Sequence, residues 1–156
     1  MGFGRRLTAI IAPGLAAAVL AAGCGGSSAP LSTQELIAKG DALCQAEQQK
    51  FTEVQAEAPA NASDAADQTG ELADAAGSAF DGLDDLTPPA QLKQAYDGYL
   101  DSMRQARDLL DQGRDAADQQ DAAAYAKAQA ELAAHAKQRR KRARAVGFKT
   151  CSEFGG

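Results

Sequence analysis

The sequence predicts an all-α fold, an up-down-up-down four-helix bundle that follows an N-terminal signal peptide. Large apolar residues recur at intervals of three and four through an alanine-rich chain of 156 residues, which is the spacing of one helix face. Helix start and stop signals divide residues 32–156 into four segments of similar length. Short connections between matched helices favour antiparallel neighbours, and hence this topology.

The first helix is predicted to begin at Ser32. Ser32 and Glu35 have the spacing of a capping box, in which each side chain bonds the backbone N–H of the other residue. Pro59 is expected to end the helix. The apolar residues of this segment fall on one stripe: Leu36, Ile37, Leu43, Cys44, Phe51 and Val54.

The second helix follows Asn61-Ala62-Ser63 and has two contrasting faces. The apolar face contains Leu72, Ala76, Phe80 and Leu83. The opposite face carries five carboxylates, on Asp64, Asp67, Glu71, Asp74 and Asp81. Carboxylates strung along a helix do not converge on one ion, and the sequence has no calcium-binding loop of the Asp-x-Asp-x-Asp-Gly type. We therefore interpret this face as solvated rather than metal-binding.

Thr87-Pro88-Pro89 is expected to open the third helix, because proline fits the first helical position. The stripe of this helix contains Leu92, Tyr96, Tyr99, Met103, Ala106 and Leu110. We place the next break near residue 119, in Asp118-Gln119-Gln120-Asp121, with Gly113 as the alternative. A single helix from Pro89 to Val146 would instead give a three-helix bundle with one long C-terminal helix.

The fourth helix is expected to end at Val146, because Gly147 followed by Phe148 resembles a glycine C-cap with its apolar neighbour. Its stripe contains Tyr125, Leu132, Ala136, Ala143 and Val146.

The N-terminal 23 residues have the order of a signal peptide. Arg5 and Arg6 precede an apolar run over residues 7–22, which gives way to small residues. Pro13 and Gly14 interrupt that run, and it falls short of the roughly 20 apolar residues that a membrane-spanning helix needs. A cleaved export signal is therefore favoured over a permanent anchor.

The segment Leu20-Ala21-Ala22-Gly23-Cys24 resembles a bacterial lipobox. The resemblance implies that a diacylglyceryl group is attached to Cys24 and that the chain is cut just before it. Residues 24–31 would then be the lipidated cysteine and a flexible Gly/Ser tether, and residues 32–156 would form the bundle domain. We expect a lipid-anchored protein on the extracytoplasmic face of the cell membrane. Secretion without a lipid and an uncleaved anchor are the alternatives.

Two cysteines remain once Cys24 carries a lipid. Cys44 and Cys151 are an even number in an exported, oxidising setting, which predicts a disulfide between them. In an up-down-up-down bundle the fourth helix ends beside the start of the first. A Cys44–Cys151 disulfide would therefore join the two ends of the domain.

Three short motifs mark a wider resemblance. They are Ala42-Leu43-Cys44, Leu86-Thr87-Pro88-Pro89 and Gly147-Phe148-Lys149-Thr150-Cys151. With the lipobox, they make the chain similar to small, uncharacterised exported lipoproteins of high-GC Gram-positive (actinobacterial-type) bacteria. The resemblance implies a helical domain with paired cysteines and brings no known activity.

The charge pattern is acidic overall with one basic segment. The chain has 16 basic and 21 acidic residues, which disfavours a nucleic-acid partner. The basic segment contains Lys137, Arg139, Arg140, Lys141, Arg142 and Arg144. Cations suit a helix C-terminus and could pair with Asp81, Asp84 and Asp85. Alternatively, the segment could contact anionic lipid headgroups, a cell-wall polymer or a protein.

The sequence offers little for catalysis. His135 is the only histidine, and the position three residues before it, where a di-iron bundle needs a glutamate, holds Leu132. We expect no catalytic residue, metal or cofactor, and predict a non-enzymatic interaction domain anchored at the cell envelope. The alternative is a small-ligand binding module. Its predicted pocket is lined by Tyr96, Tyr99, Met103 and Tyr125.

Overall fold

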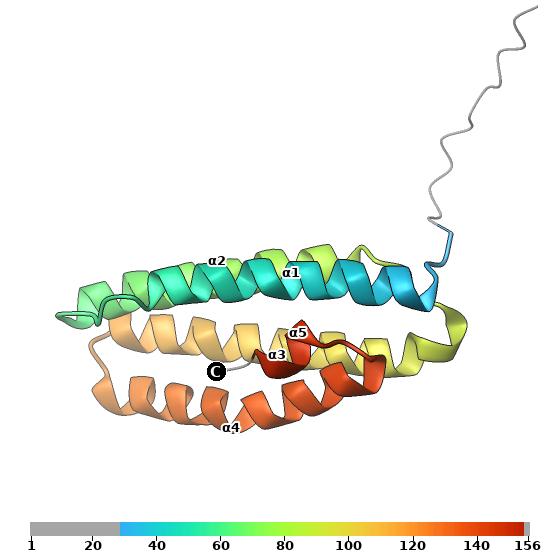
Figure 1. Ribbon diagram of the computed structural model, residues 1–156. Coiled ribbons are helices and arrows are strands. Elements are labelled where there is room, and N and C mark those ends of the chain that lie inside the picture. The colour runs from blue at the N-terminus through green and yellow to red at the C-terminus, as the bar shows by residue number, and fades with distance from the viewer. Residues whose placement is uncertain (1–28, 155–156) are drawn as a thin grey trace, which may run out of the picture.

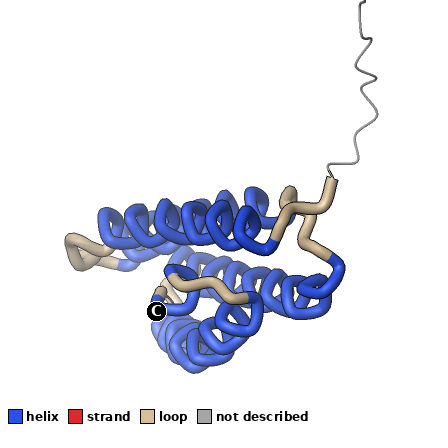
Figure 2. The backbone as a smooth tube through the Cα atoms, turned by 45° about the vertical axis from the view of Figure 1, so that its right-hand side comes forward, coloured by secondary structure: helices blue, strands red, loops and turns tan. Residues whose placement is uncertain are grey.

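The computed structural model describes residues 29–154, which form a bundle of helices (Figure 1). The four long helices are α1 (Thr33–Val54), α2 (Ala62–Asp84), α3 (Lys93–Asp118) and α4 (Ala122–Val146). Two short ones are the 3₁₀-helix η1 (Ala90–Leu92) and α5 (Thr150–Glu153). Figure 2 shows only helices and loops in this part of the chain. The all-α bundle prediction is confirmed.

α1 begins as predicted but ends earlier. The Ser32 hydroxyl accepts a hydrogen bond from the Glu35 amide at 3.2 Å, and the Glu35 carboxylate accepts one from the Ser32 amide at 2.9 Å. The helix ends at Val54 rather than at Pro59. The Gln68 side-chain amide explains the early end, because it donates to the carbonyl oxygens of Val54 and Glu57, both at 2.8 Å.

The start of α3 corrects a second prediction. Pro89 does not occupy the first position of α3. It is the N-cap of η1, whose turn is closed by a hydrogen bond from the Leu92 amide to the Pro89 carbonyl at 2.9 Å. This tight turn precedes the α-helix, so α3 begins only at Lys93.

The break between α3 and α4 lies at residues 119–121, within the predicted segment. Gln120 has a φ of 56°, which turns the chain, and the Asp121 carboxylate caps α4 by accepting from the amides of Ala123 and Ala124. Gly113 lies inside α3, so the alternative break there is wrong. The three-helix alternative is also wrong.

The end of α4 carries the predicted glycine cap. Gly147 has a φ of 101°, and its amide donates to the carbonyls of Ala143 and Arg144. The Phe148 amide also donates to the Ala143 carbonyl, at 3.1 Å, and the Phe148 ring is buried. This cap redirects the chain from α4 toward α1.

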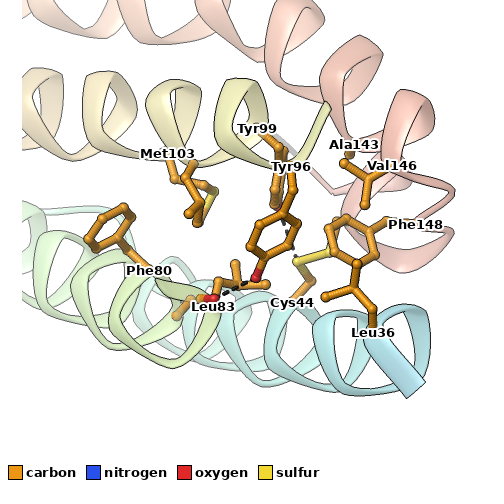
Figure 3. Packing of buried hydrophobic residues seen from close by; sticks show 13 residues of the cluster. Leu36, Cys44, Phe80, Leu83, Tyr96, Tyr99, Met103, Ala143, Val146 and Phe148 are labelled. Carbon is orange, nitrogen blue, oxygen red and sulfur yellow. Dashed lines mark hydrogen bonds between the residues drawn. A yellow bond between two sulfur atoms is a disulfide. The ribbon is translucent and has the colours of Figure 1, made fainter. Parts of the chain in front are cut away.

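The largest apolar cluster lies at the end of the bundle where α1 begins and α4 ends (Figure 3). It includes the disulfide between Cys44 and Cys151, whose Cα atoms are 5.2 Å apart. The Phe148 ring packs edge-on against the rings of Tyr96 and Tyr99. The disulfide therefore ties together an end of the domain that is already closely packed.

The four long helices do not enclose the core equally on all sides. α3 packs against α2 and α4, and α1 packs against α2, whereas α1 and α4 have few close backbone contacts. α5 lies between α1 and α4 and contacts both (Figures 1 and 2). The Asp41 carboxylate of α1 holds it there by accepting from the amides of Lys149 and Cys151, at 3.0 and 3.3 Å. None of the helices within residues 29–154 has the length and apolar character needed to cross a membrane.

Candidate functional site

α4 divides the predicted basic segment between surface and interior. Lys137, Lys141 and Arg144 are exposed, lie along one side of the helix and form no ion pair within residues 29–154. We call these three residues the basic stripe. Arg140 and Arg142 are half-buried, and the Arg142 guanidinium donates to the Gly98 carbonyl of α3.

Arg139 departs most from the predicted patch. It is only 6% exposed, and its guanidinium pairs with Glu47 of α1. It therefore belongs to the interior and not to the cationic surface, although all six cations were expected to share one patch. Within the described residues, no ion pair joins Lys137, Lys141 or Arg144 to Asp81, Asp84 or Asp85.

The acidic face of α2 lies away from the basic stripe. Asp64, Asp67, Glu71, Asp74 and Asp81 are all exposed. α2 packs against α1 and α3, whereas α4 packs against α3 and α5, so α3 separates the two charged helices. Glu71 lies 3.9 Å from Lys50 of α1, not near α4. The acidic face of α2 and the basic stripe of α4 therefore lie on helices that α3 separates.

The Glu47–Arg139 pair is buried where α1 faces α4. Arg139 Nη1 lies 3.5 Å from Glu47 Oε1, and the two side chains are 8% and 1% exposed. Glu47 Oε2 has no hydrogen-bond partner within the described residues. The guanidinium also stacks over the Phe154 ring, at 5.4 Å from its centroid. One long contact therefore joins two charged groups that are both hidden from water.

Burial changes the acidity of Glu47. Desolvation raises the pKa of its carboxyl to about 7, and the nearby Arg139 charge opposes that rise. Near neutral pH the side chain is therefore close to the midpoint of its titration.

The burial of Glu47 and Arg139 could have been predicted from helical spacing, although both are charged residue types. Glu47 lies three residues after Cys44 and four before Phe51, and both of these are buried on the apolar stripe of α1. Arg139 has the same relation to Ala136 and Ala143 in α4. Each charge occupies a position where the pattern requires an apolar residue. A charge at such a position indicates a buried partner.

A cavity of about 110 Å³ is lined by Arg139 but not by Glu47, and all four long helices contribute to it. Its wall is mostly apolar, with Phe51, Leu72, Leu110 and Leu132 among the lining residues. Arg139 supplies a charge that does not depend on pH. Ala133 lines the cavity and is exposed, so the cavity opens at the surface.

The predicted ligand pocket is not formed. Tyr96, Tyr99 and Met103 are fully buried in the apolar cluster of Figure 3, and the Tyr96 hydroxyl donates to the Leu83 carbonyl. Tyr125 instead packs against Ala65, Ala66 and Ala117 in a separate cluster. The pocket fails because the Phe148 ring fills the space beside the two tyrosines.

Two further predicted residues have simple placements. His135 is half-buried, and its Nε2 lies 2.9 Å from the Ser102 carbonyl oxygen. Cys24, the predicted lipidation site, lies outside the described residues. In the described range of 29–154, His, Cys, Asp and Glu form no group suited to holding a metal ion.

No protein family matches the chain, and no curated protein sequence or solved structure is significantly similar to it.

Proposed function

We propose that the chain is a membrane-anchored lipoprotein of the cell envelope, and that its helical domain rests on anionic lipid headgroups through the basic stripe. In this proposal a lipid on Cys24 supplies the first attachment and the stripe supplies the second. The domain acts through surface contacts and not through catalysis. The observation that carries the proposal is the exposure of three cations on one side of α4, none of which has a carboxylate partner within residues 29–154.

The position of the stripe supports a membrane contact. α4 ends at Val146, and the chain then turns onto α1 through the contact between Asp41 and Lys149. Residue 31 lies at this same end, where the Leu31 amide donates to the Thr87 carbonyl at 2.9 Å. A tether attached before residue 31 would therefore hold the C-terminal part of α4 near the lipid surface (Figure 1).

The charge distribution supports one orientation. A negative membrane surface attracts the basic stripe and repels the acidic face of α2, so both charges favour α4 facing the bilayer. Each cation near an anionic surface contributes roughly 1 kcal/mol. Three cations would then strengthen binding about 100-fold, since about 1.4 kcal/mol is a factor of ten. The two acyl chains of a diacylglyceryl group would already anchor the protein stably, so the stripe would chiefly set the orientation of the domain on the membrane.

Vesicle binding by the unlipidated chain tests the proposal. The mature chain with Cys24→Ser is mixed at low salt with vesicles that contain phosphatidylglycerol. The stripe variant combines Lys137→Gln, Lys141→Gln and Arg144→Gln, and we expect it to bind on the order of 100-fold more weakly. Vesicles of phosphatidylcholine alone should bind neither protein.

A matched control separates position from net charge. The control variant combines Lys50→Gln, Lys93→Gln and Lys127→Gln. It also loses three positive charges, but from exposed sites on α1, α3 and α4 that lie outside the basic stripe. This control should retain most of the binding. Equal losses in both variants would mean that only net charge matters, and unchanged binding in the stripe variant would refute the orientation.

A further inference from the structure

Arg139 is a largely buried cation that lines the cavity and has few hydrogen-bond partners. A guanidinium has five N–H donors. Within residues 29–154, Nη1 contacts Glu47 Oε1 at 3.5 Å and Met103 Sδ at 3.9 Å, while Nε and Nη2 donate to nothing. Neither nitrogen is among the fully buried atoms that lack a partner within the described residues, so both are accessible to a ligand that enters from the surface.

A purely structural ion pair would look different. A guanidinium and a carboxylate that serve only to join two helices can form two short, parallel hydrogen bonds. Here the single contact is at the limit of hydrogen-bond length, and Glu47 Oε2 has no partner. Both partners therefore have unused hydrogen-bonding capacity, and Arg139 lines a cavity that a ligand can enter.

The adjoining cavity is suited to hydrocarbon. Phe51, Leu72, Leu110 and Leu132 contribute to its wall, and its volume is about 110 Å³. For comparison, an engineered apolar cavity of about 150 Å³ binds benzene. The cavity here is smaller, so it would enclose only part of a hydrocarbon chain, and the rest would extend past Ala133 to the surface.

We propose that this cavity binds a small apolar monocarboxylate, whose carboxylate oxygens accept hydrogen bonds from Arg139 and whose hydrocarbon packs against Phe51, Leu110 and Leu132. The planar guanidinium matches a carboxylate geometrically. A single guanidinium beside Glu47 favours a monoanion over a dianion, because a second negative charge would be left uncompensated in an apolar site.

Glu47 can adapt to a second carboxylate. Burial raises its pKa to about 7, so a small further rise leaves it protonated and neutral when an anion binds nearby. The titratable groups close to it are Arg139 of α4 and the Tyr99 phenol of α3, with Lys50, Glu71 and Asp74 around the neighbouring surface depression. Arg139 can thus exchange its ion-pair partner, from the Glu47 carboxylate to the carboxylate of the ligand.

Titration of the full mature chain with sodium hexanoate, followed by NMR, tests the proposal. We expect saturable shifts of the Arg139 side-chain Nε–H and of the Leu110 and Leu132 methyl groups, with a Kd on the order of 1 mM. Hexanol, which lacks the charge, and acetate, which lacks the hydrocarbon, should each bind at least about tenfold more weakly. Equal binding of hexanol and hexanoate would overturn carboxylate recognition, and the absence of saturable shifts would overturn the site.

Two α4 variants test the location without disturbing the buried pair. Ala133→Phe places a ring at the mouth of the cavity and should abolish hexanoate binding. Ala130→Phe adds the same ring at an exposed position outside the cavity and should leave binding unchanged. Equal effects would overturn the location.

Arg139→Lys and Arg139→Met then separate charge from geometry. The lysine variant should retain weak binding and the methionine variant none. If Arg139→Met does not fold, the comparison of Ala133→Phe with Ala130→Phe still tests whether the ligand binds in the cavity. The basic stripe does not line this cavity. The ligand-binding proposal and the membrane-contact proposal can therefore fail independently of each other.

Discussion

Replacing Glu47 by glutamine should change how the stability of the domain depends on pH. The carboxyl is buried against Arg139, and its pKa is raised from 4.5 to about 7 because burial penalises the charged form. Glutamine has nearly the same shape but does not titrate. The substitution therefore removes one proton-binding group from both the folded and the unfolded chain.

The sign and size of the effect follow from this shift. Between pH 4.5 and 7 the folded state holds a proton on Glu47 that the unfolded state has released. This contribution to stability is fully present below pH 4.5, falls as the pH rises, and is lost above about pH 7. Since one pKa unit corresponds to 1.36 kcal/mol, the loss is on the order of 3 kcal/mol. This pH dependence has the opposite sign to that of a carboxylate in an exposed ion pair, whose contribution to stability is lost as the pH falls.

Urea unfolding of the oxidised protein at a series of pH values between 4.5 and 8 measures the effect. The free energy of unfolding of the wild type, minus that of Glu47→Gln, should fall by on the order of 3 kcal/mol across this range. Contributions from other groups, such as Glu35, cancel in the difference. Glu57→Gln, at an exposed site on the loop after α1, should give a nearly constant difference. A constant difference for Glu47→Gln as well would show that the carboxyl is not desolvated.

Two further predictions concern the cysteines. Replacing both Cys44 and Cys151 by serine removes a crosslink between residues separated by 107 positions, and should lower the free energy of unfolding by about 4 to 5 kcal/mol. Unfolding in urea without reductant measures this, and a loss below about 1 kcal/mol would mean that packing alone holds the ends together. If the chain is a lipoprotein, the form extracted from bacterial membranes should begin at Cys24 and carry a diacylglyceryl group. Its intact mass tests this, and a chain that retains residues 1–23 would contradict it.

Helix ends with a local chemical cause were predictable from sequence. The capping box at Ser32 and the glycine cap at Gly147 depend on residues within a few positions of each other, and both are observed. Where α1 ends could not be predicted, because it depends on the Gln68 amide, which comes from another helix. The start of α3 was predicted wrongly because proline can precede either an α-helix or the 3₁₀ turn that forms at Pro89.

The buried pair was hidden by a different kind of error. The sequence places Arg139 among six neighbouring cations, but successive residues of a helix point in different directions. Arg139 lies three residues after Ala136 and four before Ala143, which places it inside, and the same reasoning applies to Glu47. The cavity itself had no signal in the sequence, because it depends on the separation of α1 from α4.

That separation, in turn, depends on the C-terminal segment. α5 has only four residues, too few to show a helical period, and the disulfide and Asp41 fix it between α1 and α4. Phe154, which follows it directly, packs edge-on against Phe51 at 5.2 Å and lies under the Arg139 guanidinium. The crosslink therefore does more than restrict the unfolded chain, because it also places the aromatic ring that covers the buried charge. Stability and the proposed ligand site are coupled through α5, while the basic stripe, on the exposed side of α4, is independent of both.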